Sequence, residues 1–128
     1  LGPHDSLLIR CGEGVVVWVV NNGLTKNSAY LAASLVGYVL ELKAEDILLP
    51  DRGPRDMVRA RQVAMYLSHV GLEMSLSRVA SAFARDRSTV AHACHRIEEM
   101  RDEADFDAWL DRLEQGLTAI APLNERAA

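Results

Sequence analysis

The sequence predicts a mainly α fold, a small helical bundle that contains a helix-turn-helix. Apolar residues recur every three or four positions from residue 28 onward, which is the period of one helix face. Cap residues, glycines and prolines divide this part into segments of helical length. The 128 residues, 49% of them apolar, suffice for one domain with a real core. We therefore expect an N-terminal extension (residues 1–27), a helical domain (28–118) and a C-terminal tail (119–128).

The N-terminal extension contains two short apolar runs, at residues 7–9 and 15–20, on either side of a Gly-Glu-Gly turn. Valine favours strands, so the two runs are compatible with a hairpin. A buried helix fits as well, because runs this short show no period. Both structures stay open for this segment.

Composition excludes several classes of protein. The longest apolar run has six residues, whereas a membrane-spanning helix needs roughly 18. The sequence contains no GxxxxGK[ST] loop and no recognisable secretory signal. The two cysteines, Cys11 and Cys94, lie far apart without a CxxC pair, which excludes a disulfide framework and favours a reducing, cytoplasmic setting. We expect no membrane contact, no nucleotide and no cofactor.

Two helices are predicted before residue 50. Ser28 is a suitable N-cap for the first, whose apolar stripe repeats at intervals of four, four and three residues: Leu31, Leu35, Val39 and Leu42. Residues 44–49 form a second, short helix that ends at Pro50, because the residue before a proline disfavours the helical conformation. A loop rich in glycine, proline and charge follows over residues 50–56.

Four further helices follow this loop. The first spans residues 57–70, ends at Gly71 and has as its core stripe Ala60, Val63, Ala64, Leu67 and Val70. Ser75 caps a short helix whose inner residues are Leu76, Val79, Ala80 and Phe83. A tight connection at residues 84–86 leads into a helix over residues 87–101. The last helix spans residues 105–117 and places on one face Phe106, Trp109, Leu110, Leu113 and Leu117.

Charge is distributed unevenly along the chain. The net charge is −4, but residues 51–97 carry 8 arginines and 4 acidic residues, whereas residues 98–128 carry 3 arginines and 9 acidic residues. A local excess of positive charge attracts phosphate even when the whole chain is acidic. The basic middle segment therefore indicates a nucleic-acid partner, with an ordinary solvated surface as the alternative.

The helix predicted over residues 87–101 has two distinct faces. At 100° per residue, the apolar face collects Val90, Ala93, Cys94 and Ile97. A polar face roughly 130° away collects Thr89, His92 and Arg96. A recognition helix needs such a face, because its first turns read base edges in the major groove while cations hold phosphates. The alternative is an ordinary wet face.

Charged residues lie directly before this helix and also in the earlier loop at residues 50–56. Asp86 can accept a hydrogen bond from a cytosine amino group, and it is also a normal N-cap. Upstream, four arginines lie within ten residues on the Gly/Pro loop and the following helix start: Arg52, Arg55, Arg59 and Arg61. An arginine loop of this kind is suited to enter a minor groove. The alternative is a solvated loop that Asp51 and Asp56 partly neutralise.

Several stretches resemble the C-terminal DNA-binding domain of the bacterial replication initiator DnaA. The family signature, GGRDH[ST]TV.HA, is similar to Arg-Asp-Arg-Ser-Thr-Val-Ala-His-Ala at residues 85–93. An ARQ.AMYL block precedes it at residues 60–67, and Ser-Leu at 75–76 and Ala-Phe at 82–83 lie between the two. The resemblance covers about residues 34–117. It implies a helical domain that binds short, asymmetric DnaA-box sequences in double-stranded DNA.

The resemblance also implies which residues contact DNA. The signature run and the histidine after it contact DNA, and Arg96 takes the place of a phosphate-binding lysine. Arg61 and Gln62 match a pair that touches the DNA backbone, and residues 75–77 match apolar and phosphate contacts. With the loop arginines, the predicted DNA-binding residues are Arg52, Arg55, Arg61, Gln62, Ser75, Leu76, Ser77, Arg85, Asp86, Arg87, Ser88, Thr89, His92 and Arg96.

The chain departs from the family pattern at four positions. Ala84 stands where the family has two glycines, which shortens the turn by one residue, and Arg87 replaces the signature histidine. Ser77 replaces a usual proline, and Gly53 falls at the family's minor-groove arginine. These changes bear on the preferred DNA sequence rather than on DNA binding itself. The 128 residues leave no room for the ATP-binding motor domain of the full-length initiator, so we expect no ATPase activity.

We therefore expect a sequence-specific double-stranded DNA-binding protein, a transcription regulator or a modulator of replication at DnaA-type boxes, and not an enzyme. The alternative is a protein-interaction module that retains the fold and has lost DNA affinity, with residues 15–20 buried in a homodimer. A metal site at His92, Cys94 and His95 is not expected, because Cys94 and His92 point to different sides of the helix. Catalysis by Ser88, His92 and Asp86 is not expected either, because no oxyanion elbow or buried orienting group is recognisable.

Overall fold

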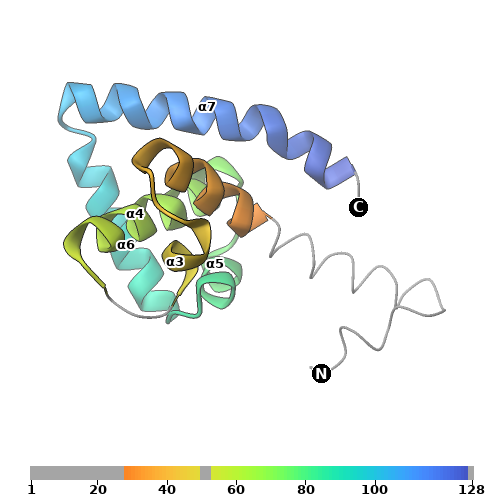
Figure 1. Cartoon of the computed structure of the whole chain (residues 1–128), viewed down its shortest axis with the longest axis horizontal. Coiled ribbons are helices and arrows are strands. Elements are labelled where there is room, and N and C mark those ends of the chain that lie inside the picture. Colours follow the sequence, from red (N-terminus) through yellow and green to blue (C-terminus); the bar gives the residue numbers. More distant parts are fainter. Residues whose placement is uncertain (1–27, 50–52, 127–128) are drawn as a thin grey trace.

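Helices make up most of the part of the chain that the structure describes. The structure, a computed structural model, describes residues 28–49 and 53–126, with side chains up to residue 120 (Figure 1). The expectations for residues 1–27, including the apolar run at 15–20, and for Arg52 lie outside these residues. Within the described ranges no strand occurs, so the prediction of a mainly α helical bundle is confirmed.

The element order follows the predicted order closely. A helix over residues 28–40 is followed by α3 (Ala44–Leu48), α4 (Arg55–Tyr66), the π-helical turn η1 (Leu67–Gly71), α5 (Leu76–Phe83), α6 (Arg87–Met100) and α7 (Ala104–Arg126). The central helix α4 packs against α3 and α6, α5 packs against α6, and α7 packs against η1. Figure 1 shows α7 across one side of the bundle and the α5–α6 connection at the opposite side.

The buried face of the helix over residues 28–40 differs from the predicted stripe. The buried positions are Ala29, Ala32, Ala33 and Val36. Leu31 and Leu35 are only half-buried, and Val39 is 38% exposed. The period was right, but the stripe was assigned to the wrong face, because small alanines allow close helix packing that a count of large apolar residues misses.

Gly37 determines how this helix ends. The Leu42 N–H donates to the Gly37 carbonyl oxygen at 2.8 Å, across Glu41, whose φ is 61°. A Cβ at Gly37 would lie 2.4 Å from the Leu42 carbonyl oxygen. The chain therefore turns away at residue 41, and Leu42 lies beyond the helix on which it was predicted.

Helix α4 begins at Arg55, two residues before the predicted start, and widens into a π-helical turn near its end. Ala60, Val63, Ala64 and Leu67 are buried as predicted, but Val70 is 39% exposed. The Leu72 N–H donates to the Leu67 carbonyl, five residues earlier, at 3.0 Å. The wider turn shifts the residues after Leu67 around the helix axis, so Val70 leaves the core stripe.

The short helix α5 and the turn after it form as predicted. The Ser75 hydroxyl oxygen accepts a hydrogen bond from the Arg78 N–H at 3.2 Å, which makes Ser75 a true N-cap. The inner residues Val79, Ala80 and Phe83 are buried. Ala84 takes the left-handed conformation with φ 54°, and the Arg85 N–H closes the turn on the Ala80 carbonyl at 2.9 Å.

The last helix is longer than predicted. Leu110, Leu113 and Leu117 are buried as expected, with Phe106 and Trp109 half-buried beside them. The helix continues to Arg126 through most of the segment expected to be a tail (119–128), although Ile120 is already 46% exposed. The apolar stripe marks where the helix stops contacting the core, not where the helix ends. None of the described helices is long and apolar enough to cross a membrane.

Cys94 is expected to be chemically inert in the folded protein. Burial, with a smaller contribution from the Glu98 carboxylate, raises the pKa of its thiol to about 11. Since the thiolate is the reactive form, alkylation at about pH 8, close to the ordinary thiol pKa, should be slow for the folded chain. In a Cys11→Ser variant, the alkylated mass should appear only after denaturant is added. Fast alkylation of the folded variant would contradict this burial.

Candidate nucleic-acid interface

The polar face predicted for α6 is exposed, and the opposite face is buried. Val90, Ala93, Cys94 and Ile97 lie in the core. Thr89, His92 and Arg96 lie on the surface. The core packing of α6 against α4 and α5 thus fixes which side of the helix a ligand can reach.

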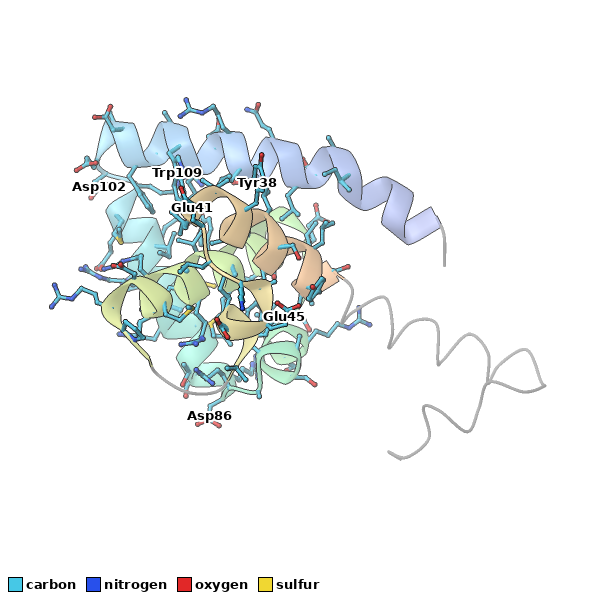
Figure 2. The ribbon with its side chains drawn as sticks, in the orientation of Figure 1. Tyr38, Glu41, Glu45, Asp86, Asp102 and Trp109 are labelled. Atoms are coloured by element: carbon cyan, nitrogen blue, oxygen red, sulfur yellow. The ribbon has the colours of Figure 1, made fainter. Side chains whose placement is uncertain are left out.

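The N-terminal end of α6 is also exposed. Asp86 occupies the N-cap position with φ −73° and ψ 151°, but its side chain makes no cap hydrogen bond. Arg87 and Ser88, the first two residues of the helix, are exposed beside it. Figure 2 shows Asp86 at the outer edge of the molecule. The carboxylate of Asp86 is therefore exposed and not used for capping.

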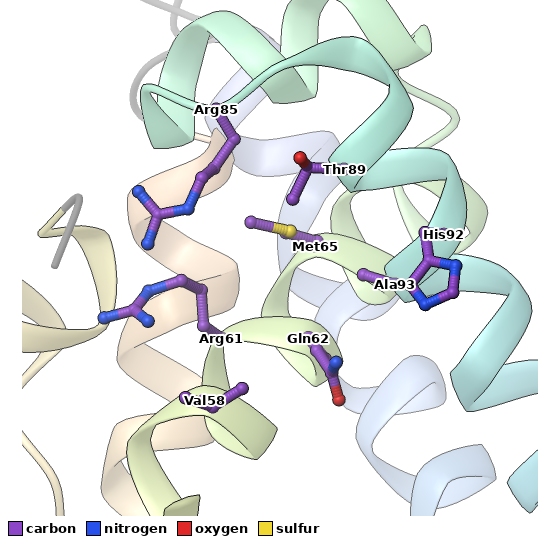
Figure 3. Close-up of a pocket in the computed structure, with 8 residues that line it drawn as sticks. All are labelled: Val58, Arg61, Gln62, Met65, Arg85, Thr89, His92 and Ala93. Atoms are coloured by element: carbon purple, nitrogen blue, oxygen red, sulfur yellow. The ribbon is translucent and has the colours of Figure 1, made fainter. Parts of the chain in front are cut away.

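An open pocket of about 300 Å³ lies between α4 and α6 (Figure 3). Its lining residues are Val58, Arg61, Gln62, Met65, Arg85, Thr89, His92 and Ala93. Five of these belong to the predicted DNA-binding set although they come from two separate stretches of sequence: Arg61, Gln62, Arg85, Thr89 and His92. The fold therefore brings the arginine-glutamine pair and the signature run to one surface.

Arg61 and Arg85 have partners inside the protein. Arg61 is only 4% exposed; its Nε donates to the Ile47 carbonyl at 2.8 Å and its Nη2 to the Asp46 carbonyl at 3.2 Å. Arg85 is half-buried, and its Nη2 donates to the Leu49 carbonyl at 3.4 Å. The guanidinium of Arg61 is thus directed at the protein backbone, and its contact with DNA stays a prediction.

Arg59 also contacts a residue of the pocket, although the sequence analysis placed it only in the arginine cluster and not among the predicted DNA-binding residues. Its Nη1 donates to Gln62 Oε1 at 3.0 Å and lies 2.9 Å from Met100 Sδ. Gln62 is consequently held by a neighbour three residues earlier on α4, while it lines the pocket. The i, i+3 spacing of Arg59 and Gln62 was the signal that could have revealed this contact.

The remaining described residues of the predicted set do not line the pocket. Arg55 is exposed at the first position of α4, directly after the loop in which Gly53 has φ 69°. Ser75 and Ser77 are exposed and Leu76 is half-buried at the start of α5. The Ser75 hydroxyl already serves as the helix cap, so its oxygen has a structural function before any DNA contact.

The ion pairs on the exposed face of α6 are weak. Arg96 Nη1 lies 3.7 Å from Glu99 Oε1, and the Arg96 side chain is 51% exposed. The His95 ring lies 3.4 Å from the same carboxylate, and its side chain is 73% exposed. Exposed pairs of this kind contribute at most about 1 kcal/mol. Arg96 can therefore exchange Glu99 for a phosphate at little cost.

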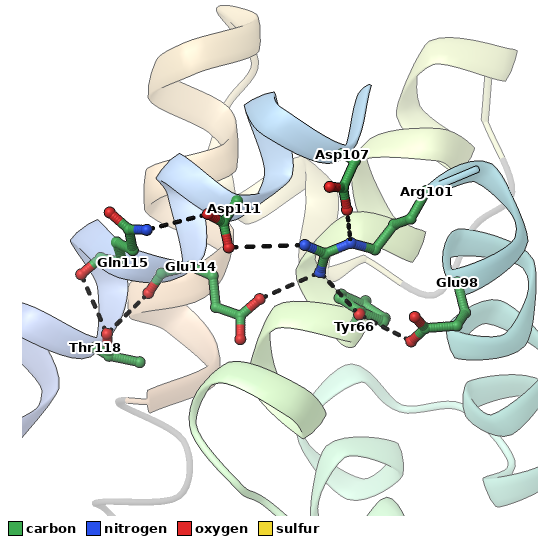
Figure 4. Close-up of polar contacts among 8 residues, drawn as sticks. All are labelled: Tyr66, Glu98, Arg101, Asp107, Asp111, Glu114, Gln115 and Thr118. Atoms are coloured by element: carbon green, nitrogen blue, oxygen red, sulfur yellow. Dashed lines mark hydrogen bonds and ion pairs between the residues drawn. The ribbon is translucent and has the colours of Figure 1, made fainter. Parts of the chain in front are cut away.

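The acidic C-terminal part of the chain is held away from this face. Arg101, at the end of α6, contacts carboxylates on α7: Asp107, Asp111 (3.8 Å) and Glu114 (3.3 Å) (Figure 4). The Tyr66 hydroxyl accepts from Arg101 Nη1 at 3.0 Å and donates to Glu98 at 2.9 Å. Asp102, at this corner, and Asp86 lie at opposite ends of Figure 2. The acidic residues of α7 are therefore separated in space from the first turn of α6, as the uneven charge along the sequence suggests (Figure 1).

Comparison with known proteins identifies this arrangement. The family model described as the bacterial DnaA protein helix-turn-helix matches residues 33–97, from the first described helix to the end of the buried stripe of α6. The chain belongs to this family. The DnaA-type resemblance of the sequence is thereby confirmed, and the described domain is a DnaA-type helix-turn-helix DNA-binding domain.

Solved structures agree with the DnaA-type fold. A crystal structure of a DNA replication initiation factor superposes with a TM-score of 0.70 at 29% identity over 77% of this chain. A replication initiator DnaA bound to AMPPCP and single-stranded DNA superposes with a TM-score of 0.67 at 28% identity over 76% of this chain. The matched region spans 30% of each of those chains.

Proposed function

We propose that this DnaA-type domain binds double-stranded DNA sequence-specifically, with α6 as its recognition helix in the major groove. The observation that carries the proposal is the orientation of α6, whose buried stripe leaves Thr89, His92 and Arg96 on the surface. In helix-turn-helix proteins the first residues of such a helix contact base edges. Here those residues are exposed and lie beside a pocket with arginines on its wall.

The proposed contacts fall into two groups. The residues at and near the start of α6 read base edges: Asp86, Arg87, Ser88, Thr89 and His92. The surrounding residues hold the sugar-phosphate backbone or a minor groove: Arg52, Arg55, Gln62, Ser75, Leu76, Ser77, Arg85 and Arg96. Arg61 is left out of both groups, because its side chain is 4% exposed.

At the level of the cell, we propose that this binding regulates transcription or modulates replication by occupying DnaA-type boxes. Occupancy alone is the mechanism; the 128 residues contain no GxxxxGK[ST] loop, so this stretch of chain has no P-loop with which to turn over ATP. With a role on bacterial DNA, we also propose a cytoplasmic location for the protein. Neither a homodimer nor a purely protein-binding module gains support from the described residues.

Selection of bound duplexes from a random library, at a stated salt concentration, tests the proposal. Enrichment of a DnaA-box-like consensus is the expected result. Enrichment of a different consensus would keep sequence-specific binding and assign the change to Ala84 and Arg87, which depart from the family signature. No enrichment at any salt concentration would contradict the proposal and favour the protein-interaction module.

Arg96→Ala is expected to weaken binding to selected and random duplexes by the same factor. A phosphate contact carries no sequence information, and its loss should reduce the slope of log K against log salt by about one. Fluorescence anisotropy over a salt series measures both quantities. Arg112→Ala, which removes an exposed arginine from α7, is the matched control and should leave the slope unchanged. A loss confined to the selected duplex would instead make Arg96 a base-reading residue.

A further inference from the structure

Two arginines from different parts of the chain donate to the carbonyl end of α3. Arg61, on α4, donates to the carbonyls of Asp46 (3.2 Å) and Ile47 (2.8 Å). Arg85, in the turn before α6, donates to the carbonyl of Leu49 (3.4 Å). The segment 46–49 is thus tied both to the central helix and to the start of the recognition helix.

These contacts satisfy a need of α3 itself. A helix leaves its last carbonyls without intrahelical partners, and cations near that end are favourable. α3 has five residues and no basic residue in its own last turn. Ile47 is fully buried and Arg61 nearly so, which keeps water from replacing the guanidinium. Hydrogen bonds from a charged donor in such a place are stronger than neutral ones.

The segment 46–49 also lies beside the start of the recognition helix. Arg85 is the neighbour of Asp86, the N-cap residue of α6. Holding Leu49 beside Arg85 therefore places the end of α3 against the turn that leads into α6.

We propose that Arg61 is a positioning residue for DNA binding, with Arg85 as the second tether: together they hold segment 46–49 against the turn that leads into α6. This inference rests on the proposed DNA binding. It assigns Arg61 an indirect effect on affinity, in place of the phosphate contact that the sequence predicts. The guanidinium donates from Nε and Nη2 in directions that its planar fork fixes, and the point-like ammonium of a lysine on a flexible stem does not reproduce that geometry.

Arg61→Lys and Arg61→Gln distinguish two alternatives for Arg61: positioning segment 46–49, or binding a DNA phosphate. If Arg61 positions the segment, both variants should lose about tenfold in affinity for the selected duplex, the amount expected for one charged hydrogen bond. Arg61→Lys should keep the wild-type salt slope, and both variants should keep most of their affinity for random duplex. If Arg61 instead binds a phosphate, Arg61→Lys should bind like wild type and Arg61→Gln should reduce the salt slope by about one. That result would overturn the inference.

Hydrogen exchange tests the same contact without DNA. The Leu49 N–H donates to the Asp46 carbonyl, and its exchange should accelerate about tenfold in Arg61→Lys. Unchanged exchange, or faster exchange with unchanged DNA affinity, would overturn the inference. Arg112→Lys on α7 is the matched control. If Arg61→Lys does not fold, the exchange of the Leu49 N–H in Arg85→Lys tests the second tether, and DNA affinity is not compared because Arg85 is itself a proposed DNA contact.

The two proposals fail in different ways. If the wild-type chain enriches no duplex, the proposed function is wrong, and the positioning of a DNA contact falls with it. The exchange of the Leu49 N–H then still decides whether Arg61 and Arg85 hold the segment. If the wild-type chain binds a selected duplex but Arg61→Lys binds it equally well, only the positioning inference is wrong.

Discussion

Phe83→Ala is expected to lower the free energy of unfolding by about 3–5 kcal/mol, the usual cost of removing a buried aromatic ring. Phe83 is fully buried at the last position of α5, directly before the left-handed Ala84. The ring anchors the helix before the turn against the core, so its loss leaves a cavity beneath the helix-turn-helix. The loss is large compared with the stability of about 5–15 kcal/mol typical of a domain.

Urea unfolding followed by circular dichroism measures this loss. Val70→Ala is the matched control, because it removes apolar atoms from a side chain that is 39% exposed. Its effect should stay below about 1 kcal/mol. A Phe83→Ala variant as stable as Val70→Ala would show that α5 does not pack against the core as described.

Asp86→Ala and Thr89→Ala are each expected to weaken binding to the selected duplex by about 1–3 kcal/mol, with little change for random duplex. Asp86 has no cap hydrogen bond and Thr89 lines the open pocket, so both side chains can contact bases. Removing the carboxylate of Asp86 also removes repulsion from phosphates. The loss on the selected duplex must therefore exceed that gain, and affinity for random duplex should stay equal or rise slightly.

Two controls separate base contact from charge and folding. Asp102→Ala removes an exposed carboxylate at the far end of the molecule (Figure 2), and should not weaken binding to the selected duplex. Thr118→Ala removes an exposed threonine from α7 in the same way. Equal losses on selected and random duplexes for Asp86→Ala and Thr89→Ala would contradict the proposed docking of α6, since base contacts act on one sequence only.

The sequence was sufficient where a property depends on neighbours along the same helix. The buried stripe of α6 and its polar face follow from the helical period, and both were predicted residue by residue. The cap at Ser75 and the turn at Ala84 depend on local hydrogen bonds, and they were placed correctly too. The DnaA-type signature lies on these same residues, so the family was recognisable for the same reason.

Other properties depend on how the helices pack together, and helical periodicity could not predict them. Tertiary packing determines which face of the helix over residues 28–40 is buried. That face carries alanines, and the leucines lie at its margin. Val70 lies outside the core because of the π-helical turn, and the spacing of apolar residues does not predict such a turn.

The burial of Arg61 is of the same kind, because its partners on α3 are 14 and 15 residues away in the chain. Periodicity describes one helix at a time. Whether Arg61 faces solvent or donates to backbone carbonyls depends on where α3 lies. The position of α3 beside α4 is a property of the tertiary structure, which the period of α4 does not contain.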